Sequence, residues 1–184
     1  MRKPIAQAAA MILAAGLSTI PVWSQTASPL KPASVFSFSF EVTLPAPPAE
    51  IYDALTGDIS GWWDHHFSEK PYRLYIEAKP GGGFMEIFDV SGDGARHATV
   101  ILAERGKRLR FDGPLGLSGR AVQMVTSYDL APSGQGATVL TLSVHGSGEI
   151  EETVPGLVEN VWRHFLVERF KPYIESGAYK KAKR

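Results

Sequence analysis

The sequence predicts an α+β domain with an antiparallel β-sheet of about seven strands, two short helices after the first strand and one long C-terminal helix. Between residues 36 and 144, apolar and polar side chains alternate with a period of two in several short stretches, which Gly- or Pro-bearing turns separate. From about residue 153 the apolar period changes to 3.6. An antiparallel sheet that is apolar on one face must bury that face. Because the C-terminal helix is the only element long enough to cover it, we expect the two to pack together.

The N-terminus has the pattern of a secretory signal peptide. Positive charges at residues 2–3 precede a largely apolar run over residues 4–22. Polar residues and a proline interrupt this run and leave it short of the roughly 20 apolar residues that a membrane span needs. We therefore expect residues 1–24 to be removed by cleavage before Gln25, with Ala27 as a second possible site. The protein would then be periplasmic or secreted, with no stable membrane anchor.

Composition limits the rest of the chain to one domain. Removal of the signal leaves 160 residues with 17 Lys and Arg against 19 Asp and Glu, a formal net charge of −2. This balance does not attract nucleic acid. The absence of Cys excludes disulfides, thiol chemistry and a lipid anchor on an N-terminal Cys. We expect a disordered spacer over residues 25–34, the domain over residues 35–177 and a solvated basic tail over residues 178–184.

The first expected elements are a strand and two short helices. Every second residue from Phe36 to Leu44 is apolar, which is typical of a strand with one buried face. Three prolines follow this strand, and Pro48 suits the first turn of a helix that runs to Leu55. A second short helical turn is expected over Ile59–Trp63, before a polar loop.

Six further strands follow, joined by tight turns. The Gly-rich segments 81–83 and 92–94 are expected as turns, and residues 113–119 as a longer loop. Gly81–Gly83 leads into a strand, so it is not expected to bind phosphate, which would need a helix there. The six strands are expected over Pro71–Ala78, Phe84–Val90, Ala98–Glu104, Leu109–Phe111, Val122–Leu130 and Leu140–Val144.

The C-terminal helix is expected to begin near Thr153, with Pro155 in its first turn, and to end at Gly177. Pro172 is expected to kink its last turn. One broad arc of the helix is apolar and comprises Val158, Val161, Trp162, Phe165, Leu166, Phe170 and Tyr173.

This order of elements, with particular residues, resembles the START-like superfamily, also called SRPBCC or polyketide cyclase/dehydrase-like. Within it, the chain is most similar to homologues of the activator of the heat-shock-protein-90 ATPase. The resemblance covers roughly residues 36–175. The matching segments are Pro47–Thr56, Trp62-Trp63, Pro80–Phe84, Gly92–Gly94, Leu109–Phe111 and the long helix with Trp162.

The resemblance implies a helix-grip fold, in which a curved antiparallel sheet wraps around the C-terminal helix and encloses a cavity. Members of the superfamily hold lipids, steroids or polyketides there, but the fold hosts binders, cyclases and regulators alike and does not imply a reaction. Co-chaperone members work in the cytosol on an ATP-driven partner. An exported protein would meet neither, which argues against that role here.

The aromatic residues are candidates to line the cavity, although each is also compatible with ordinary core packing. Trp62 and Trp63 stand out, because two adjacent Trp side chains on a short turn are not expected to point into one core. One of them should lie at a surface or at the cavity mouth. The full set of candidate ligand-binding residues is Trp62, Trp63, Phe84, Glu86, Phe88, Phe111, Met124, Tyr128, Trp162, Phe165, Arg169 and Tyr173.

Arg169 is the most specific of these candidates. At 100° per residue it falls near the middle of the apolar arc of the long helix, beside Trp162 and Phe165. It is expected to hold an anionic ligand group, to pair with Glu86, or to pack its stem and reach solvent with its head. Glu86 is expected on the same side of its strand as Phe84, Phe88 and Val90.

No metal site, cofactor or catalytic set is predicted. His65 and His66 are adjacent and should diverge, while the other three His residues show no ligand spacing. We therefore expect an exported protein that binds a small apolar or amphipathic molecule, with any protein partner unknown. Two alternatives stay open. One is an enzyme of cyclase, dehydratase or hydrolase type that uses Arg169, Glu86 or Tyr128 in the same cavity, and the other is a protein-interaction module without a ligand.

Overall fold

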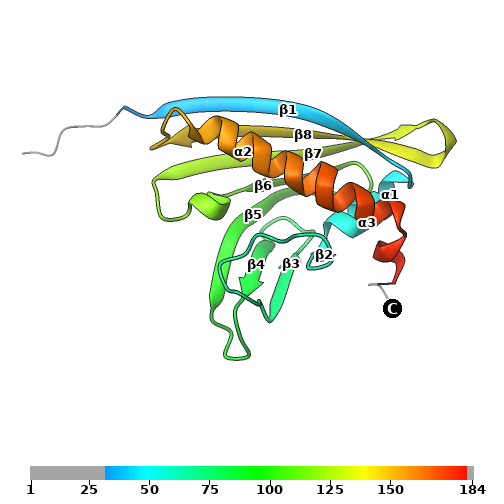
Figure 1. Ribbon diagram of the computed structural model, residues 1–184, viewed down its shortest axis with the longest axis horizontal. Helices are drawn as coiled ribbons and strands as arrows, with labels where there is room; N and C mark the ends of the chain where they lie inside the picture. Colours follow the sequence, from blue (N-terminus) through cyan, green and yellow to red (C-terminus); the bar gives the residue numbers. More distant parts are fainter. Residues whose placement is uncertain (1–31, 182–184) are drawn as a thin grey trace, which may run out of the picture. The chain divides into compact units, whose positions relative to one another are not determined.

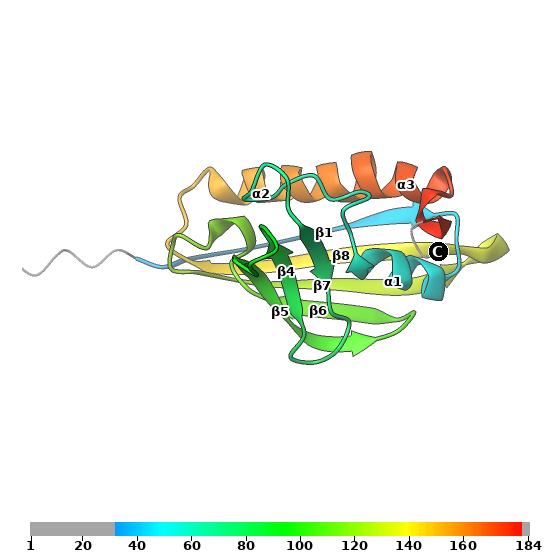
Figure 2. The ribbon, with the colours of Figure 1, turned by 90° about the horizontal axis from the view of Figure 1, so that it is seen from below.

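A computed structural model of the protein describes residues 32–181. As predicted, the domain is α+β: an open antiparallel sheet with strand order β1-β8-β7-β6-β5-β4-β3-β2 and a long C-terminal helix, a helix-grip arrangement (Figure 1). Figure 2 shows the helix as a layer over the sheet. The predicted signal peptide lies outside the described residues. The strands are β1 Ser34–Leu44, β2 Gly57–Asp58, β3 Arg73–Ile76, β4 Gly83–Ile87, β5 Gly94–Glu104, β6 Arg108–Asp112, β7 Val122–Ser133 and β8 Ala137–Gly148.

The first strand forms one edge of the sheet, beside the last strand. β1 pairs with β8 over its whole length, from Ser34 opposite Gly148 to Leu44 opposite Thr138. The alternation predicted for β1, β7 and β8 is present, and the buried side chains form one core under the helix. The period of two therefore located the buried face of the long strands.

The segment after the first helix differs from the prediction. The helix α1 spans Pro48–Leu55, with proline in its first turn as expected. Gly57–Asp58 then pairs with Tyr75 and Ile76 as an eighth strand, which the alternation analysis missed because it is two residues long. Ile59–Trp63 is a hydrogen-bonded turn and not a second helix: the Trp63 N–H donates to the Ile59 carbonyl at 3.0 Å.

The C-terminal helix is continuous but not regular. It consists of α2 over Val154–Arg163, a π-helical stretch over His164–Phe170, and α3 over Lys171–Glu175. The Lys171 N–H donates to the Leu166 carbonyl, five residues back. Pro172 follows directly and has no N–H to donate. We expected a kink at Pro172. The irregularity that the structure shows is the wider, π-helical turn that precedes this proline.

The chain after the helix is not the expected solvated tail in its described part. Gly177 has φ of 71°, and Ala178–Lys180 forms a 3₁₀ turn. Tyr179 is buried, and its hydroxyl donates to the Glu50 carboxylate at 2.7 Å. Within residues 32–181, no helix is long and apolar enough to cross a membrane.

The Gly-rich turn at residues 81–83 has a purely structural explanation. Gly81 has φ of +80°, a value that side-chain-bearing residues rarely adopt. A Cβ on Gly82 would lie 2.3 Å from the Glu77 carbonyl oxygen. β4 follows this turn, as predicted, so no helix N-terminus is present here to bind phosphate.

Candidate functional site

A pocket of about 290 Å³ lies between the long helix, the loops at residues 63–67 and 115–117, and the strands β5 and β7. Its walls are mainly aliphatic and aromatic. Among the described residues, no Asp, Glu, Lys or Arg lines it, and three histidines are its titratable groups. The pocket is lined by Trp63, His65, His66, Phe67, His97, Leu115, Gly116, Leu117, Met124, Leu157, Val158, Val161, Trp162 and Phe165.

The adjacent tryptophans occupy the core together, contrary to the prediction that they could not. Trp62 is 1% exposed, and its indole N–H donates to the Ala54 carbonyl. Trp63 is 8% exposed, stacks on Phe165 with ring centroids 3.7 Å apart, and forms part of the pocket wall. Both indoles fit because they pack edge to face, with ring centroids 5.5 Å apart and planes at 74°. One of the two was expected at a surface or at the cavity mouth, and Trp63 lines the pocket while almost fully buried.

A fully buried carboxylate lies behind the pocket. Glu86 on β4 has no exposed surface. Its oxygens accept hydrogen bonds from the backbone N–H groups of Phe67 and Ser68, from the Ser68 hydroxyl and from the His97 ring, all at 2.8–2.9 Å. The loop at residues 67–68 therefore folds over Glu86 and supplies donors that a buried carboxylate requires.

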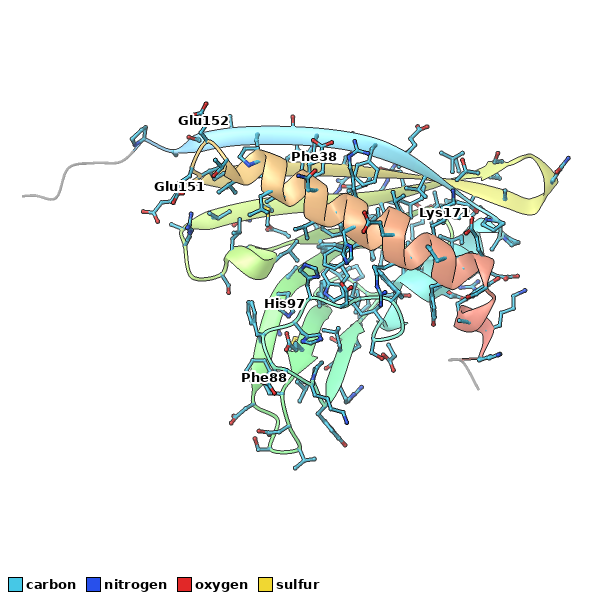
Figure 3. All side chains as sticks on the ribbon, viewed as in Figure 1. Phe38, Phe88, His97, Glu151, Glu152 and Lys171 are labelled. Atoms are coloured by element: carbon cyan, nitrogen blue, oxygen red, sulfur yellow. The ribbon has the colours of Figure 1, made fainter. Side chains whose placement is uncertain are left out.

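His97 connects this carboxylate to the pocket. It is 6% exposed, lines the pocket, and lies in the upper part of the β4–β5 region in Figure 3. A carboxylate can only accept, so His97 Nε2 carries the proton in its 2.9 Å bond to Glu86. In this neutral tautomer the other ring nitrogen, Nδ1, holds a lone pair. The Glu86–His97 pair thus offers a hydrogen-bond acceptor of fixed tautomer beside an apolar cavity.

A β-bulge positions His97. Phe84 pairs with Ala98 and Met85 with Arg96, which leaves His97 as the extra residue on β5. Strict alternation would place His97 on the face opposite to Ala98, but the bulge brings both side chains into the interior.

Both groups have shifted pKa values, and burial is the largest single cause acting on each. Burial lowers the pKa of His97 below 6.5, only partly opposed by the Glu86 carboxylate. Burial alone would raise the pKa of Glu86. The hydrogen bonds from Ser68, Phe67 and His97 outweigh it, so the pKa lies below its ordinary value. At neutral pH the pair is accordingly a carboxylate and a neutral imidazole.

Two buried hydroxyls lie on the inner face of β7. The side-chain oxygens of Thr126 and Tyr128 have no hydrogen-bond partner among the described residues. Tyr128 packs against Phe111 and Trp162, and burial raises the pKa of its hydroxyl well above 10. It is therefore a neutral phenol at any ordinary pH.

A polar group of residues stands at the mouth of the pocket. Asp64 contacts His65 Nδ1 and His164 Nε2 at 2.9 Å each. We refer to Asp64, His65 and His164 as the mouth cluster. His164 Nδ1 lies 2.8 Å from Glu168, and its pKa is raised mainly by the hydrogen bonds to Glu168 and Asp64. His65 belongs both to this cluster and to the pocket wall.

The structure divides the twelve predicted site residues into three groups. Four line the pocket: Trp63, Met124, Trp162 and Phe165. Five are buried in the core outside the pocket wall: Trp62, Phe84, Glu86, Phe111 and Tyr128. The remaining three lie away from the pocket: Phe88, Arg169 and Tyr173.

Arg169 is not in the middle of the apolar arc. Its side chain is 45% exposed, and its Nε lies 3.1 Å from Asp64 Oδ2. Arg169 therefore does not pair with Glu86 and does not line the pocket. The expected position assumed 100° per residue. In the π-helical stretch each residue turns by less, which moves residue 169 to the edge of the arc.

Phe88 and Tyr173 are displaced for other reasons. β4 ends at Ile87, so Phe88 and Val90 leave the sheet instead of continuing the inner face of Glu86. Figure 3 shows Phe88 on the β4–β5 hairpin, farther from the helix than His97. Tyr173 lies beyond the π-helical stretch, where its ring approaches Gly61 and Tyr179.

Sequence reasoning missed the loop residues and His97. Leu115 and Leu117 lie in a Gly- and Pro-bearing loop that was expected to be only a connection, yet Leu115 is 8% exposed. Two leucines, two positions apart in this loop, could have indicated that the loop contributes to a buried site. His97 gave no signal, because it preceded the expected strand and a bulge cannot be detected from alternation.

No family model and no curated protein matches the chain. Solved structures do. They include a protein of Rhodobacter sphaeroides (18% identity, 80% of this chain and 98% of that chain, TM-score 0.56) and a protein of unknown function from Staphylococcus aureus (12%, 82% and 97%, 0.55). A protein of Chromobacterium violaceum is also similar (21%, 76% and 96%, 0.53). At these identities the likeness shows the fold alone.

Proposed function

We propose that this protein is an exported member of the START-like superfamily, most similar to homologues of the activator of the heat-shock-protein-90 ATPase. It binds a small apolar or amphipathic molecule in the pocket described above. The ligand is neutral and carries a hydrogen-bond donor that His97 recognises. The predicted signal peptide supports export, and mass spectrometry of the exported protein tests it. Material that begins at Gln25 is expected, and an intact Met1 in a membrane fraction contradicts export.

The observation that carries the proposal is the pocket itself. Its volume of about 290 Å³ is at the lower end of the range for small-molecule sites, and aromatic and aliphatic side chains dominate its walls. A charged ligand group would find no countercharge among the lining residues, so the ligand's body is neutral. Of the three roles expected for Arg169, the anion anchor is therefore not part of this proposal.

His97 supplies the specificity. The carboxylate of Glu86 holds the proton on Nε2, so Nδ1 can accept a hydrogen bond but cannot donate one. A ligand hydroxyl would satisfy it, whereas a methyl ether of the same shape would not. One such bond contributes about 0.5 to 1.5 kcal/mol, roughly a 2- to 12-fold difference in affinity.

The test uses 1-naphthol and its methyl ether, 1-methoxynaphthalene, titrated calorimetrically into the mature protein. We expect 1-naphthol to bind at one site. Val158→Phe fills the pocket wall and should weaken binding at least about tenfold. Val167→Phe is the matched control, because Val167 is 42% exposed on the same helix and does not line the pocket. Equal affinity of both variants, or no saturable binding, would refute pocket binding.

The role of His97 is tested by the difference between the two probes. Wild-type protein should prefer 1-naphthol to the methyl ether, and His97→Phe should abolish that preference while still binding both. If wild-type protein binds both probes equally, the pocket remains a binding site, but His97 does not recognise the ligand hydroxyl by a hydrogen bond.

The Glu86–His97 pair also favours a second candidate, an enzyme that uses His97 as a general base. A neutral imidazole oriented by a carboxylate in an apolar pocket can remove a proton from a carbon next to a carbonyl group. The proton moves to Nδ1, an enolate forms, and the same nitrogen returns a solvent-exchanged proton to the carbon. Exchange of the α-protons of 2-tetralone in D₂O, followed by NMR, tests this activity.

Wild-type protein should accelerate that exchange about 10²- to 10⁴-fold over His97→Phe. Equal rates for the two proteins would rule out the enzyme and leave the binding function.

A further inference from the structure

We propose that the mouth cluster is a binding site for a divalent transition-metal ion, with Asp64, His65 and His164 as its ligands. Asp64 and His65 come from the loop after the Ile59–Trp63 turn, and His164 comes from the start of the π-helical stretch. One ligand atom from each of the three lies within 4.8 Å of the other two. The fold thus brings together residues that are 100 positions apart in the sequence.

The spacing of the ligand atoms suits a small cation. Metal–nitrogen and metal–oxygen bonds of about 2.0 to 2.2 Å place neighbouring ligand atoms of a tetrahedral site about 3.3 Å apart. Asp64 lies 2.9 Å from His65 Nδ1 and 2.9 to 3.0 Å from His164 Nε2. Both Asp64–His distances are thus within a few tenths of an ångström of the tetrahedral spacing. The two histidine nitrogens lie within 4.8 Å of each other, so a rotation of the exposed His65 ring completes a site for one shared ion.

The ligand types select the class of metal. Two imidazoles and one carboxylate suit Zn²⁺, Co²⁺, Ni²⁺ or Cu²⁺, whereas Mg²⁺ and Ca²⁺ prefer oxygen ligands alone. In the metal-free protein both nitrogens of His164 face carboxylates, so an entering cation displaces the proton that Nε2 donates to Asp64. Once that proton has left, Asp64 and Glu168 bring two negative charges against one positive charge on Arg169.

Glu168 provides the supporting contact that ligating histidines usually have. Its carboxylate lies 2.8 Å from His164 Nδ1, which fixes the ring and leaves Nε2 as the ligand atom. Arg169 Nε lies 3.1 Å from Oδ2 of Asp64 and restrains that carboxylate in turn. The Phe165 ring, in a T-shaped contact with ring centroids 4.8 Å apart, restrains His65.

Three protein ligands leave one position open for water or for a donor atom of a bound molecule. The site borders the pocket, because His65 contributes to both. It does not depend on the proposed pocket function, since none of its evidence requires an occupied pocket.

The test titrates ZnCl₂ and CoCl₂ into the mature protein, produced without a polyhistidine tag and freed of metal with EDTA. We expect binding of one ion per chain and, with Co²⁺, visible absorption bands typical of a tetrahedral site. Asp64→Asn, His65→Gln and His164→Gln should each weaken binding at least about tenfold. Glu168→Gln should weaken it to a smaller extent, as expected for a positioning residue.

His66→Gln is the matched control, since His66 is the next residue of the same loop and does not belong to the cluster. It should leave metal affinity within about twofold. The proposal is overturned if no saturable binding of one ion is seen, or if His66→Gln weakens binding as much as His65→Gln. Titration of 1-naphthol in EDTA separates this result from the pocket function, because the pocket should bind its probe without metal.

Discussion

Two of the carboxylate–histidine contacts in this protein have the same length and opposite character. Glu86–His97 and Asp64–His164 each place a ring nitrogen 2.9 Å from a carboxylate oxygen. The first pair is 0% and 7% exposed, whereas the second is 35% and 30% exposed. The pKa of His97 is lowered chiefly by burial, while that of His164 is raised by its hydrogen bonds to Glu168 and Asp64. Burial of the His97 ring, and a second carboxylate beside the His164 ring, thus decide which form of each ring is favoured, although both rings lie at the same distance from their first carboxylate.

The largest difference should appear when each carboxylate is replaced by its amide. Glu86→Gln keeps the shape but removes the buried charge to which four donors are directed, and we expect a loss of about 3 kcal/mol of stability. Asp64→Asn should cost less than about 1 kcal/mol, because solvent already screens that site. Thermal and urea unfolding of both variants measure the difference. Equal losses would show that burial does not distinguish the two pairs.

A pair of buried threonines extends the comparison within the core. Thr138 donates to the Ala46 carbonyl at 2.6 Å, whereas the Thr126 hydroxyl has no partner among the described residues, and neither residue is exposed. Thr138→Val should destabilise the protein by about 1 to 2 kcal/mol. Thr126→Val should leave the free energy of unfolding unchanged or raise it by up to about 1 kcal/mol. A loss at Thr126 as large as at Thr138 would contradict this assignment, and denaturant midpoints provide the measurement.

The pH dependence of the free energy of unfolding should reflect the titration of His97. Its pKa in the folded protein is lowered from 6.5, so the unfolded chain binds the proton more strongly. The contribution of neutral His97 is therefore complete above pH 6.5 and is lost as the pH falls through the lower, folded pKa. Glu86 remains ionised at the start of this window, because its pKa is also lowered.

His97→Phe removes this titration. The stability difference between wild-type protein and the variant should shrink by about 1 kcal/mol between pH 7 and pH 5, as measured by urea unfolding at each pH. A difference that stays constant over this range would show that His97 does not titrate as a buried group.

The smallest effect is expected at Arg169. Its side chain is 45% exposed and contacts the exposed carboxylate of Asp64. Arg169→Met should therefore change stability by no more than about 0.5 kcal/mol and leave 1-naphthol affinity unaltered. A marked loss of affinity for the probe would indicate that Arg169 contacts the bound molecule, which contradicts its position outside the pocket.

Local sequence patterns were enough to predict the long strands of the sheet and the helix that packs on them. Alternation in β1, β7 and β8 identified the buried faces, and the 3.6 period identified the helix that packs on them. Trp63, Met124, Trp162 and Phe165 were predicted as cavity residues and do line the pocket. These features follow from side chains that repeat with the period of their own element, which a single stretch of sequence records completely.

Only the tertiary structure decided the polar part of the site. The bulge at His97 and the π-helical turn at Arg169 each shift a side chain off its regular period, one into the interior and the other out of it. Besides His97, the partners of Glu86 come from a loop 18 or more residues earlier, and Asp64 meets His164 from 100 residues away. The sequence by itself therefore determined which faces are buried, because burial follows a local period. Which polar groups meet depended on breaks in that period and on long-range contacts, and these exist only once the chain has folded.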